Sequence, residues 1–181
     1  MKRALLLLLI FLTVSCTCGV DTEKLRSMPS WQLADVNGVM HNFPESNNKN
    51  TMVLFWATWC PFCKKLMPHI QSILYQYGED LNLQVYAMNI FEDSDANKYL
   101  EDNGYDFLLF PAAEEVAKLY GVQGTPALFI FDAKGNLIFD LNKVNLEGIK
   151  LNDKDSNSQK ALQIAPLWAA EARKSLINKL D

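Results

Sequence analysis

Thr51–His69 reads TMVLFWATWCPFCKKLMPH, and this segment carries the strongest pattern in the chain. It begins with an apolar run, Thr51–Ala57, rich in the β-branched and aromatic residues that suit a buried strand. Two cysteines, Cys60 and Cys63, follow, and the remaining residues have the apolar spacing of a helix. A strand that delivers a CxxC pair to the start of a helix is typical of redox chemistry.

The residues around the cysteine pair predict a different part for each thiol. Pro61 suits the first position of a helix, because its missing N–H would be unpaired there and its fixed φ already fits. Cys60 is therefore expected at the N-cap, where unpaired N–H groups and the helix dipole favour a nucleophilic thiolate. Cys63 lies one turn further on, within reach of a disulfide, and Lys64 and Lys65 add positive charge. We predict an attacking Cys60 and a resolving Cys63.

Two segments resemble a known family. WATWCPFC followed by KKLMP resembles the thioredoxin superfamily, and within it the TlpA/ResA-like branch of membrane-tethered bacterial thiol–disulfide oxidoreductases. Pro68 stands where the active-site helices of that family carry a kinking proline. Tyr120–Asp132, YGVQGTPALFIFD, resembles the segment in which a cis-proline loop faces the CxxC and leads into a strand. Pro126 matches the cis-proline, and Thr125 matches the residue whose backbone pairs with a substrate polypeptide.

The resemblance covers about Met28–Leu141 and implies both a fold and a site. The implied fold is α/β and thioredoxin-like, with a central mixed β-sheet flanked by helices. An N-terminal β-hairpin precedes this core, and a helix and strand are inserted between the second core strand and the cis-proline segment. The implied substrate-binding residues are Trp59, Pro61, Phe62, Thr125 and Pro126.

Periodicity and turn residues predict the other elements. Trp31–Phe43 has two alternating arms around Asn37-Gly38, a strong hairpin signal, and His41 is expected there as a surface or pairing residue. Further strands are expected over Leu81–Ile90, Phe107–Phe110, Ala127–Phe131 and Asn136–Leu141, and helices over Ser94–Asn103, capped by Asp93 or Ser94, and Ala112–Tyr120.

The C-terminal part is expected to be irregular and then helical. Asn142–Lys160 is polar, and Lys160–Leu180 has helical spacing interrupted at Pro166. We expect the helix to pack against the sheet. Its predicted buried stripe consists of Leu162, Leu167, Trp168, Ala172, Leu176 and Leu180.

The N-terminal segment predicts export. Met1–Cys18 has a basic start, an apolar centre and a more polar exit, as a signal peptide does. Its apolar run is too short to span a bilayer, which takes about 20 residues. Residues 19–29 are expected to form a tether, and residues 30–181 a thioredoxin-like domain with a C-terminal helix.

Two cysteines lie at the end of this signal. Thr13–Cys16 resembles a bacterial lipobox, which implies a lipidated Cys16 and a membrane anchor. Cleavage after Ser15 or near Gly19 without lipidation is the alternative. Whether Cys18 is a free thiol, a second acylation site or only a residue of the signal region without a role stays open.

Composition and spacing argue against several other functions. A net charge of −4 without a long basic run does not favour nucleic-acid binding. A structural zinc site takes about four ligands. The body of the chain offers only Cys60 and Cys63 with two histidines, His41 and His69, so neither a metal nor another cofactor is expected. Peroxidase relatives place a threonine three residues before the reactive cysteine. Thr58 lies only two residues before Cys60, which argues against peroxidase activity.

Exchange also needs a group that takes the proton of the resolving thiol. Thioredoxin has an acid six residues before its first cysteine, but Leu54 stands at that position here. Met88–Glu92 resembles the TlpA/ResA segment that places a glutamate near the active site, which implies Glu92 as a proton relay. The alternative is a solvated charge at a helix start, beside Asp93 and Asp95.

The favoured function is an exported thiol–disulfide oxidoreductase that exchanges its CxxC pair with protein thiols and disulfides in the periplasm. The resemblance favours a reductant in cytochrome c maturation or a related thiol reduction, supplied with electrons by a membrane thiol–disulfide carrier. The order Pro61-Phe62, with proline first, is more like glutaredoxins and oxidising Dsb proteins, which leaves a disulfide-forming oxidant or isomerase open. A non-catalytic binding or metal-handling module is the third hypothesis, against which the CxxC facing Thr125-Pro126 argues.

Overall fold

The centre of the fold is strand β3 (Asn50–Trp56), which a computed structural model places in the middle of the sheet; the structure describes residues 29–45 and 47–178. All of β3 after its first residue is buried, because the sheet is covered on both faces, and this explains its unbroken apolar run. Its side chains alternate between two cores, with Met52, Leu54 and Trp56 in the first core and Val53 and Phe55 in the second.

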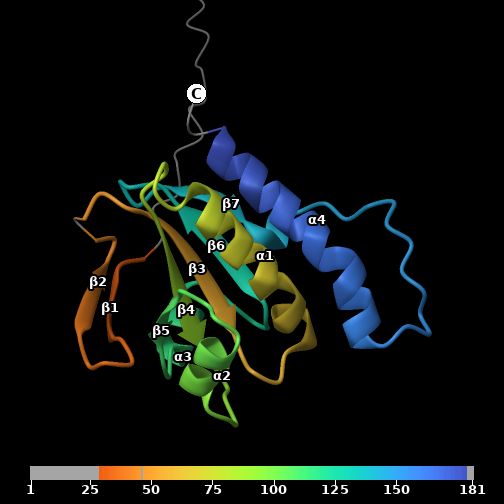
Figure 1. Cartoon of the computed structure of the whole chain (residues 1–181), viewed down its shortest axis with the longest axis horizontal. Coiled ribbons are helices and arrows are strands. Elements are labelled where there is room, and N and C mark those ends of the chain that lie inside the picture. Colours follow the sequence, from red (N-terminus) through yellow and green to blue (C-terminus); the bar gives the residue numbers. More distant parts are fainter. Residues whose placement is uncertain (1–28, 46, 179–181) are drawn as a thin grey trace, which may run out of the picture.

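The sheet is mixed, as predicted, with the strand order β5-β4-β3-β6-β7 (Figure 1). On one side of β3, β4 is parallel to it and β5 is parallel to β4. On the other side, β6 is antiparallel to β3 and β7 is antiparallel to β6. The bounds of these strands are β4 (Leu83–Asn89), β5 (Leu108–Phe110), β6 (Ala127–Phe131) and β7 (Leu137–Asp140).

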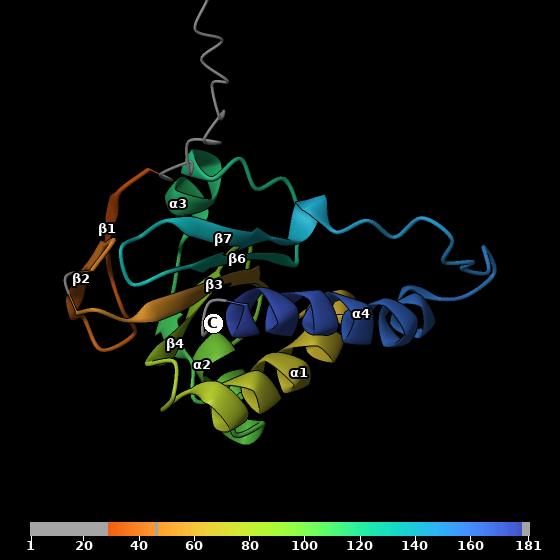
Figure 2. The same cartoon turned by 90° about the horizontal axis from the view of Figure 1, so that it is seen from above.

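Helices cover the two faces unequally (Figure 2). The first core lies under α1 (Pro61–Tyr77), α2 (Ala96–Asp102) and α4 (Asn157–Ile177), and the second lies under α3 (Glu114–Leu119). The helix and strand expected before the cis-proline segment are α2 and β5, which confirms the insertion. The cap of α2 is Asp95, whose carboxylate accepts the Lys98 N–H, rather than Asp93 or Ser94.

The predicted N-terminal hairpin is a separate two-stranded antiparallel sheet of β1 (Trp31–Ala34) and β2 (Met40–Phe43). Its aromatic side chains pack into the second core. Its connection is residues 35–39, wider than a two-residue turn, and the Asp35 carboxylate organises it by accepting backbone N–H bonds. The Val36 N–H donates to the Leu109 carbonyl of β5 at 2.9 Å, so the hairpin is bonded to the edge of the main sheet.

The last helix begins earlier than predicted and is not interrupted. After the short 3-10 helix η1 (Leu141–Lys143), residues 144–156 run out from the sheet and return to α4 (Figures 1 and 2). α4 begins at Asn157 because Ser156 and Gln159 form a capping box, and it continues through Pro166. The expectation of a helix that starts at Lys160 and breaks at the proline was therefore wrong.

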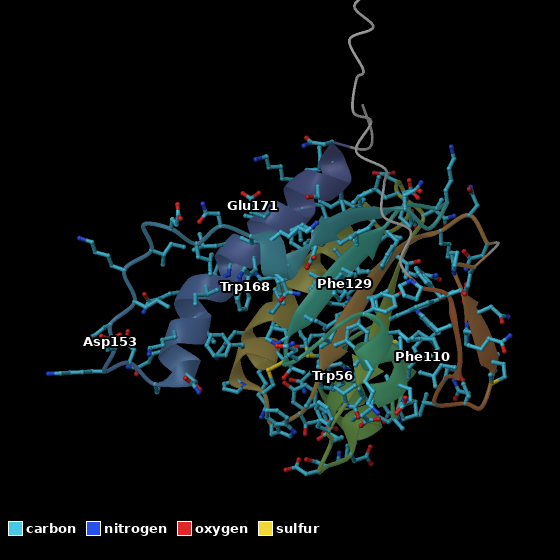
Figure 3. All side chains as sticks on the ribbon, turned by 180° about the vertical axis from the view of Figure 1, so that it is seen from behind. Trp56, Phe110, Phe129, Asp153, Trp168 and Glu171 are labelled. Carbon is cyan, nitrogen blue, oxygen red and sulfur yellow. A yellow bond between two sulfur atoms is a disulfide. The ribbon has the colours of Figure 1, made fainter. Side chains whose placement is uncertain are left out.

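The packing of α4 also differs from the prediction. The helix packs mainly on α1, and its closest neighbour in the sheet is β7. Close contact between two helices favours small side chains, so alanines form most of its buried face, and Leu162 and Leu167 are 57% and 40% exposed. Figure 3 shows Trp168 on the side of α4 that faces the body and Glu171 pointing outward. The buried residues are Ala161, Ile164, Ala165, Ala169, Ala172 and Leu176, whereas Leu180 lies outside the described residues.

Candidate active site

The cysteine pair lies at the N-terminus of α1, as predicted. Cys60 is the N-cap, with extended backbone dihedrals (φ −77°, ψ 110°), and Pro61 is the first helical residue. Cys60 and Cys63 form a disulfide with 5.3 Å between their Cα atoms. The Cys63 N–H donates to Cys60 Sγ at 3.0 Å, so a free backbone donor of the first turn is aimed at this sulfur. This geometry stabilises negative charge on Cys60 rather than on Cys63.

The two cysteines are buried, so the surface at the disulfide is formed by the adjacent residues. Cys60 is 1% exposed and Cys63 is fully buried. Pro61 and Phe62, between them, are half-buried, and Trp59 is 49% exposed. A partner that approaches the pair therefore meets mainly the indole of Trp59 and the edge formed by the Pro61-Phe62 dipeptide.

The Thr125–Pro126 peptide bond is cis, as the resemblance implied. Pro126 comes directly before Ala127 of β6, which pairs with Phe55 near the end of β3. The cis-proline loop and the residues that lead to Cys60 are therefore at the same end of the sheet. The Thr125 hydroxyl is buried and has no hydrogen-bond partner within the described part of the chain.

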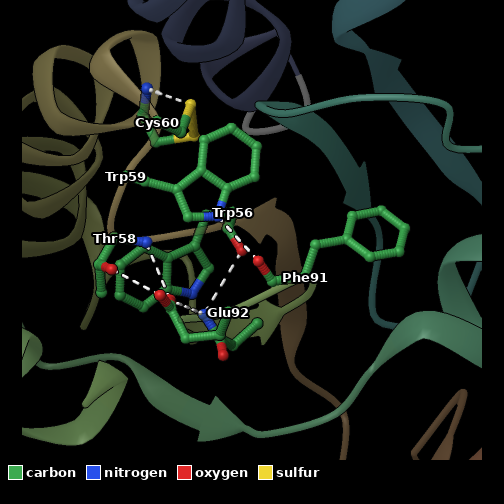
Figure 4. The surroundings of a disulfide bond; sticks show 8 residues. Trp56, Thr58, Trp59, Cys60, Phe91 and Glu92 are labelled. Atoms are coloured by element: carbon green, nitrogen blue, oxygen red, sulfur yellow. Dashed lines mark hydrogen bonds between the residues drawn. A yellow bond between two sulfur atoms is a disulfide. The ribbon is translucent and has the colours of Figure 1, made fainter. Parts of the chain in front are cut away.

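Glu92 lies beside Thr58, two residues before Cys60 (Figure 4). Its carboxylate accepts bonds from the Thr58 N–H at 2.9 Å and the Thr58 hydroxyl at 2.5 Å. It also accepts from the Asn89 amide at 2.7 Å and the Asp93 N–H at 2.9 Å. Glu92 thus joins the segment after β3, which leads to the redox pair, to the segment after β4.

This environment argues against the proton relay expected from the sequence. Burial by itself would raise the pKa of Glu92, but the bonds from Thr58, Asn89 and Asp93 outweigh it and lower the pKa to about 2. A carboxylate with so low a pKa is a weak base near neutral pH. The geometry favours a fixed anion that positions Thr58 and the backbone leading to Cys60.

Phe91 is part of this surface and was not predicted. It is 60% exposed and has a left-handed backbone conformation (φ 53°). Its carbonyl accepts the Trp59 indole N–H at 2.7 Å, and its N–H donates to the Glu114 carboxylate at 2.9 Å. No sequence signal marks this residue, because its orientation depends on partners 32 and 23 positions away along the chain.

Other side chains singled out from the sequence have partners elsewhere in the structure. Lys64, expected to add charge near the pair, has its ammonium group 5.7 Å from the centre of the Tyr99 ring. His41 is a pairing residue, bonded to Asp35 and Glu45 of the hairpin region. Among the described residues, no three His, Cys, Asp or Glu side chains gather as a metal site requires.

A disulfide capped by a helix N-terminus, with an exposed tryptophan on one side and a cis-proline loop at the same sheet end, defines a thiol–disulfide oxidoreductase of thioredoxin-like fold. The family model described as a thioredoxin-like domain matches residues 36–142, and the chain belongs to this family.

Individual proteins agree with this assignment. The ResA thiol–disulfide oxidoreductase of Geobacillus thermodenitrificans is 29% identical over 140 residues, which are 74% of this chain and 80% of the relative. That of Bacillus anthracis is 27% identical over 166 residues, 81% of this chain and 94% of the relative. A DsbE-like thiol:disulfide interchange protein structure from Chlorobium tepidum has the same fold, with a TM-score of 0.55, 23% identity, and 79% and 94% of the two chains covered.

Proposed function

We propose that this protein is an exported reductant of protein disulfides, with Cys60 as the attacking and Cys63 as the resolving cysteine. In the reduced protein the Cys60 thiolate attacks one sulfur of a substrate disulfide, and the other substrate sulfur leaves as a thiolate that takes a proton from solvent. Cys63 then loses its proton and attacks Cys60 Sγ, which releases the second substrate thiolate. Two electrons pass from the Cys60–Cys63 dithiol to the substrate disulfide.

The bond from the Cys63 N–H to Cys60 Sγ carries this assignment. It supports Cys60 as the stabilised thiolate at the positive end of a long helix, and Cys63 as the thiol that resolves the mixed disulfide. The exposed indole of Trp59, the half-buried Pro61 and Phe62, and the Thr125-Pro126 loop supply the face for a substrate polypeptide.

The direction of electron flow rests on similarity to proteins named ResA and DsbE. On this basis the substrates are oxidised thiols of exported proteins, such as those of apocytochrome c. A thiol–disulfide carrier in the membrane would return the CxxC pair to its reduced form. The proline-first dipeptide Pro61-Phe62 favours the second candidate, a disulfide donor or isomerase.

The deciding measurement is the equilibrium of the Cys60–Cys63 couple against glutathione, followed by tryptophan fluorescence. Trp59 reports it because its indole lies beside the disulfide (Figure 4). A potential near that of thioredoxin, about −270 mV, supports the reductant. A value near that of DsbA, about −120 mV, assigns a disulfide donor instead.

A trapping experiment separates either enzyme from a binding module. Cys63→Ser removes the resolving thiol, so mixed disulfides between Cys60 and substrate proteins should accumulate and disappear on treatment with dithiothreitol. Cys60→Ser, the matched control, should trap none. An absence of mixed disulfides with Cys63→Ser would favour a non-catalytic scaffold.

Export and anchoring are proposed from the N-terminal sequence, which lies outside the described residues. Cys16 would carry the lipid that holds the protein at the periplasmic side of the membrane. In the described part of the chain, no helix has the length and apolar character needed to cross a bilayer. Labelling with radioactive palmitate should mark the wild-type protein and leave Cys16→Ser unmarked.

A further inference from the structure

Two exposed aromatic side chains follow one another along the surface beside the disulfide. Figure 4 shows the Trp59 indole next to the sulfur atoms and the Phe91 ring beyond it, pointing away from them. Trp59 is 49% exposed and Phe91 is 60% exposed. Large apolar side chains that stay in water next to a reactive bond form a surface that a partner can bury.

The Phe91 side chain is exposed because of an unusual backbone conformation at this residue. A bulky residue rarely adopts a positive φ, and Phe91 has φ 53°. Bonds on both sides hold this conformation, one from the Trp59 indole to the Phe91 carbonyl and one from the Phe91 N–H to the Glu114 carboxylate. The backbone therefore holds the Phe91 side chain at the surface.

An open groove continues from the residues that surround Phe91. Its volume is about 560 Å³, and four of its lining residues are acidic, while its described lining residues include neither lysine nor arginine. The four are Glu92, Asp93, Asp95 and Glu114. A groove with one sign of charge raises the local concentration of opposite charge.

We propose that Phe91 determines substrate specificity, and that the preferred substrate is an extended polypeptide with a bulky apolar residue beside its reactive cysteine and a lysine or arginine a few residues further on. The apolar residue would lie over Trp59 and Phe91, and the basic residue would reach the acidic groove. This inference rests on the proposed exchange at Cys60–Cys63 and names the class of its substrates.

The negative charge of the groove favours a basic polypeptide over a second copy of this chain or a nucleic acid. The chain has a net charge of −4, so a second copy of this chain is repelled by the acidic groove, as is a nucleic acid. A basic polypeptide is attracted, and the aromatic surface gives it an apolar contact next to the sulfur atoms.

Four synthetic peptides test the proposal with the reduced full-length protein. Each carries one cysteine as a mixed disulfide with glutathione, next to phenylalanine or glycine, followed by lysines or glutamates. The peptide with phenylalanine and lysines should be reduced about tenfold faster than the one with glycine and glutamates. Raising the salt concentration should weaken only the preference for lysine.

Phe91→Asn removes the ring while asparagine tolerates the left-handed conformation. This variant should lose the preference for phenylalanine and keep the preference for lysine. Asp93→Asn should lose the preference for lysine and keep the preference for phenylalanine. Tyr75→Asn is the matched control, because Tyr75 is a 73% exposed aromatic residue on α1, about 18 Å along the helix from Cys63, and it should behave as wild type.

The outcomes separate this inference from the function on which it rests. Equal rates with all four peptides, or faster reaction with glutamates, would overturn it while leaving normal exchange with oxidised glutathione intact. Phe91→Asn slowing exchange with glutathione itself would also overturn it, because Phe91 would then act on the redox pair. An absence of exchange with any disulfide would reject the proposed function.

Discussion

The indole of Trp168, on the last helix, lies 6.0 Å from the ring of Phe62, measured between ring centroids. Phe62 directly precedes Cys63, so this contact joins α4 to the dipeptide between the two cysteines. The helix that the sequence predicted as a cover for the sheet also supports the redox helix, against which it packs most extensively.

Trp168→Ala should lower the free energy of unfolding by about 2 kcal/mol, because it removes a half-buried aromatic contact between α4 and α1. Urea denaturation of the oxidised protein measures this. The neighbouring Leu167→Ala is the matched control: Leu167 is 40% exposed, so its loss should change stability by less than about 0.5 kcal/mol. Equal losses in the two variants would contradict the contact.

Glu92→Gln should destabilise the protein by about 2 kcal/mol at neutral pH, because the amide cannot accept all the bonds that the carboxylate accepts. The pKa of Glu92 is lowered to about 2 in the folded protein. Its stabilisation is therefore present above the unfolded value, about 4.3, and is lost as the pH falls toward about 2. Denaturation at pH 7 and near pH 2 should show the difference between variant and wild type disappear in acid.

The same variant decides between the two roles of Glu92. A positioning role predicts that exchange with glutathione falls at every pH with an unchanged pH profile, since the carboxylate stays ionised. A proton relay predicts a changed profile. Asp93→Asn, which alters the neighbouring exposed carboxylate, controls for the loss of negative charge alone.

The His41 pKa should lie above its usual value of about 6.5. Burial lowers the pKa, but hydrogen bonds and charge attraction from Glu45 and Asp35 outweigh it. The stabilisation by this group is complete below about pH 6.5 and is lost as the pH rises through the raised pKa. An NMR titration of the imidazole signals measures this directly, and a midpoint below about 6.5 would contradict the pairing.

Gly135→Ala should destabilise the protein by about 1–3 kcal/mol. Gly135 has φ 79°, and an added Cβ would lie 2.7 Å from Pro44 Cβ, so both backbone strain and overlap oppose the substitution. Gly38→Ala is a matched control with φ 81° and no atom within 4 Å of the new Cβ. It should lose only the strain, about 1 kcal/mol, and the difference in denaturation midpoint isolates the overlap with Pro44.

The features that could be predicted from the sequence are those fixed by local chemistry. Pro61 and Gly78 mark the start and end of α1, and the apolar run before them marks the buried strand β3. The cis-proline loop was recognised through its resemblance to a family, not through its own residues. These features depend on neighbours within a few positions.

Most of the missed features depend on residues far apart in the sequence. The face of α4 is set by how closely α1 approaches it, which hydrophobic spacing alone does not reveal. The low pKa of Glu92 comes largely from Thr58, 34 positions earlier, together with Asn89 and Asp93, and the conformation of Phe91 depends on Trp59 and Glu114. The capping box of Ser156 and Gln159, by contrast, is a local signal for the start of α4.

The hydrogen bond from the Val36 N–H to the Leu109 carbonyl also protects the protein against aggregation. β5 is one of the two outer strands of the sheet, and an outer strand with free N–H and C=O groups is a template for a strand of another chain. The hairpin occupies one of these groups and stands beside the others (Figure 1). Deleting the hairpin would expose the edge of β5 and part of the second core. The shortened protein should therefore aggregate through strand pairing between molecules, even while its redox site is still folded.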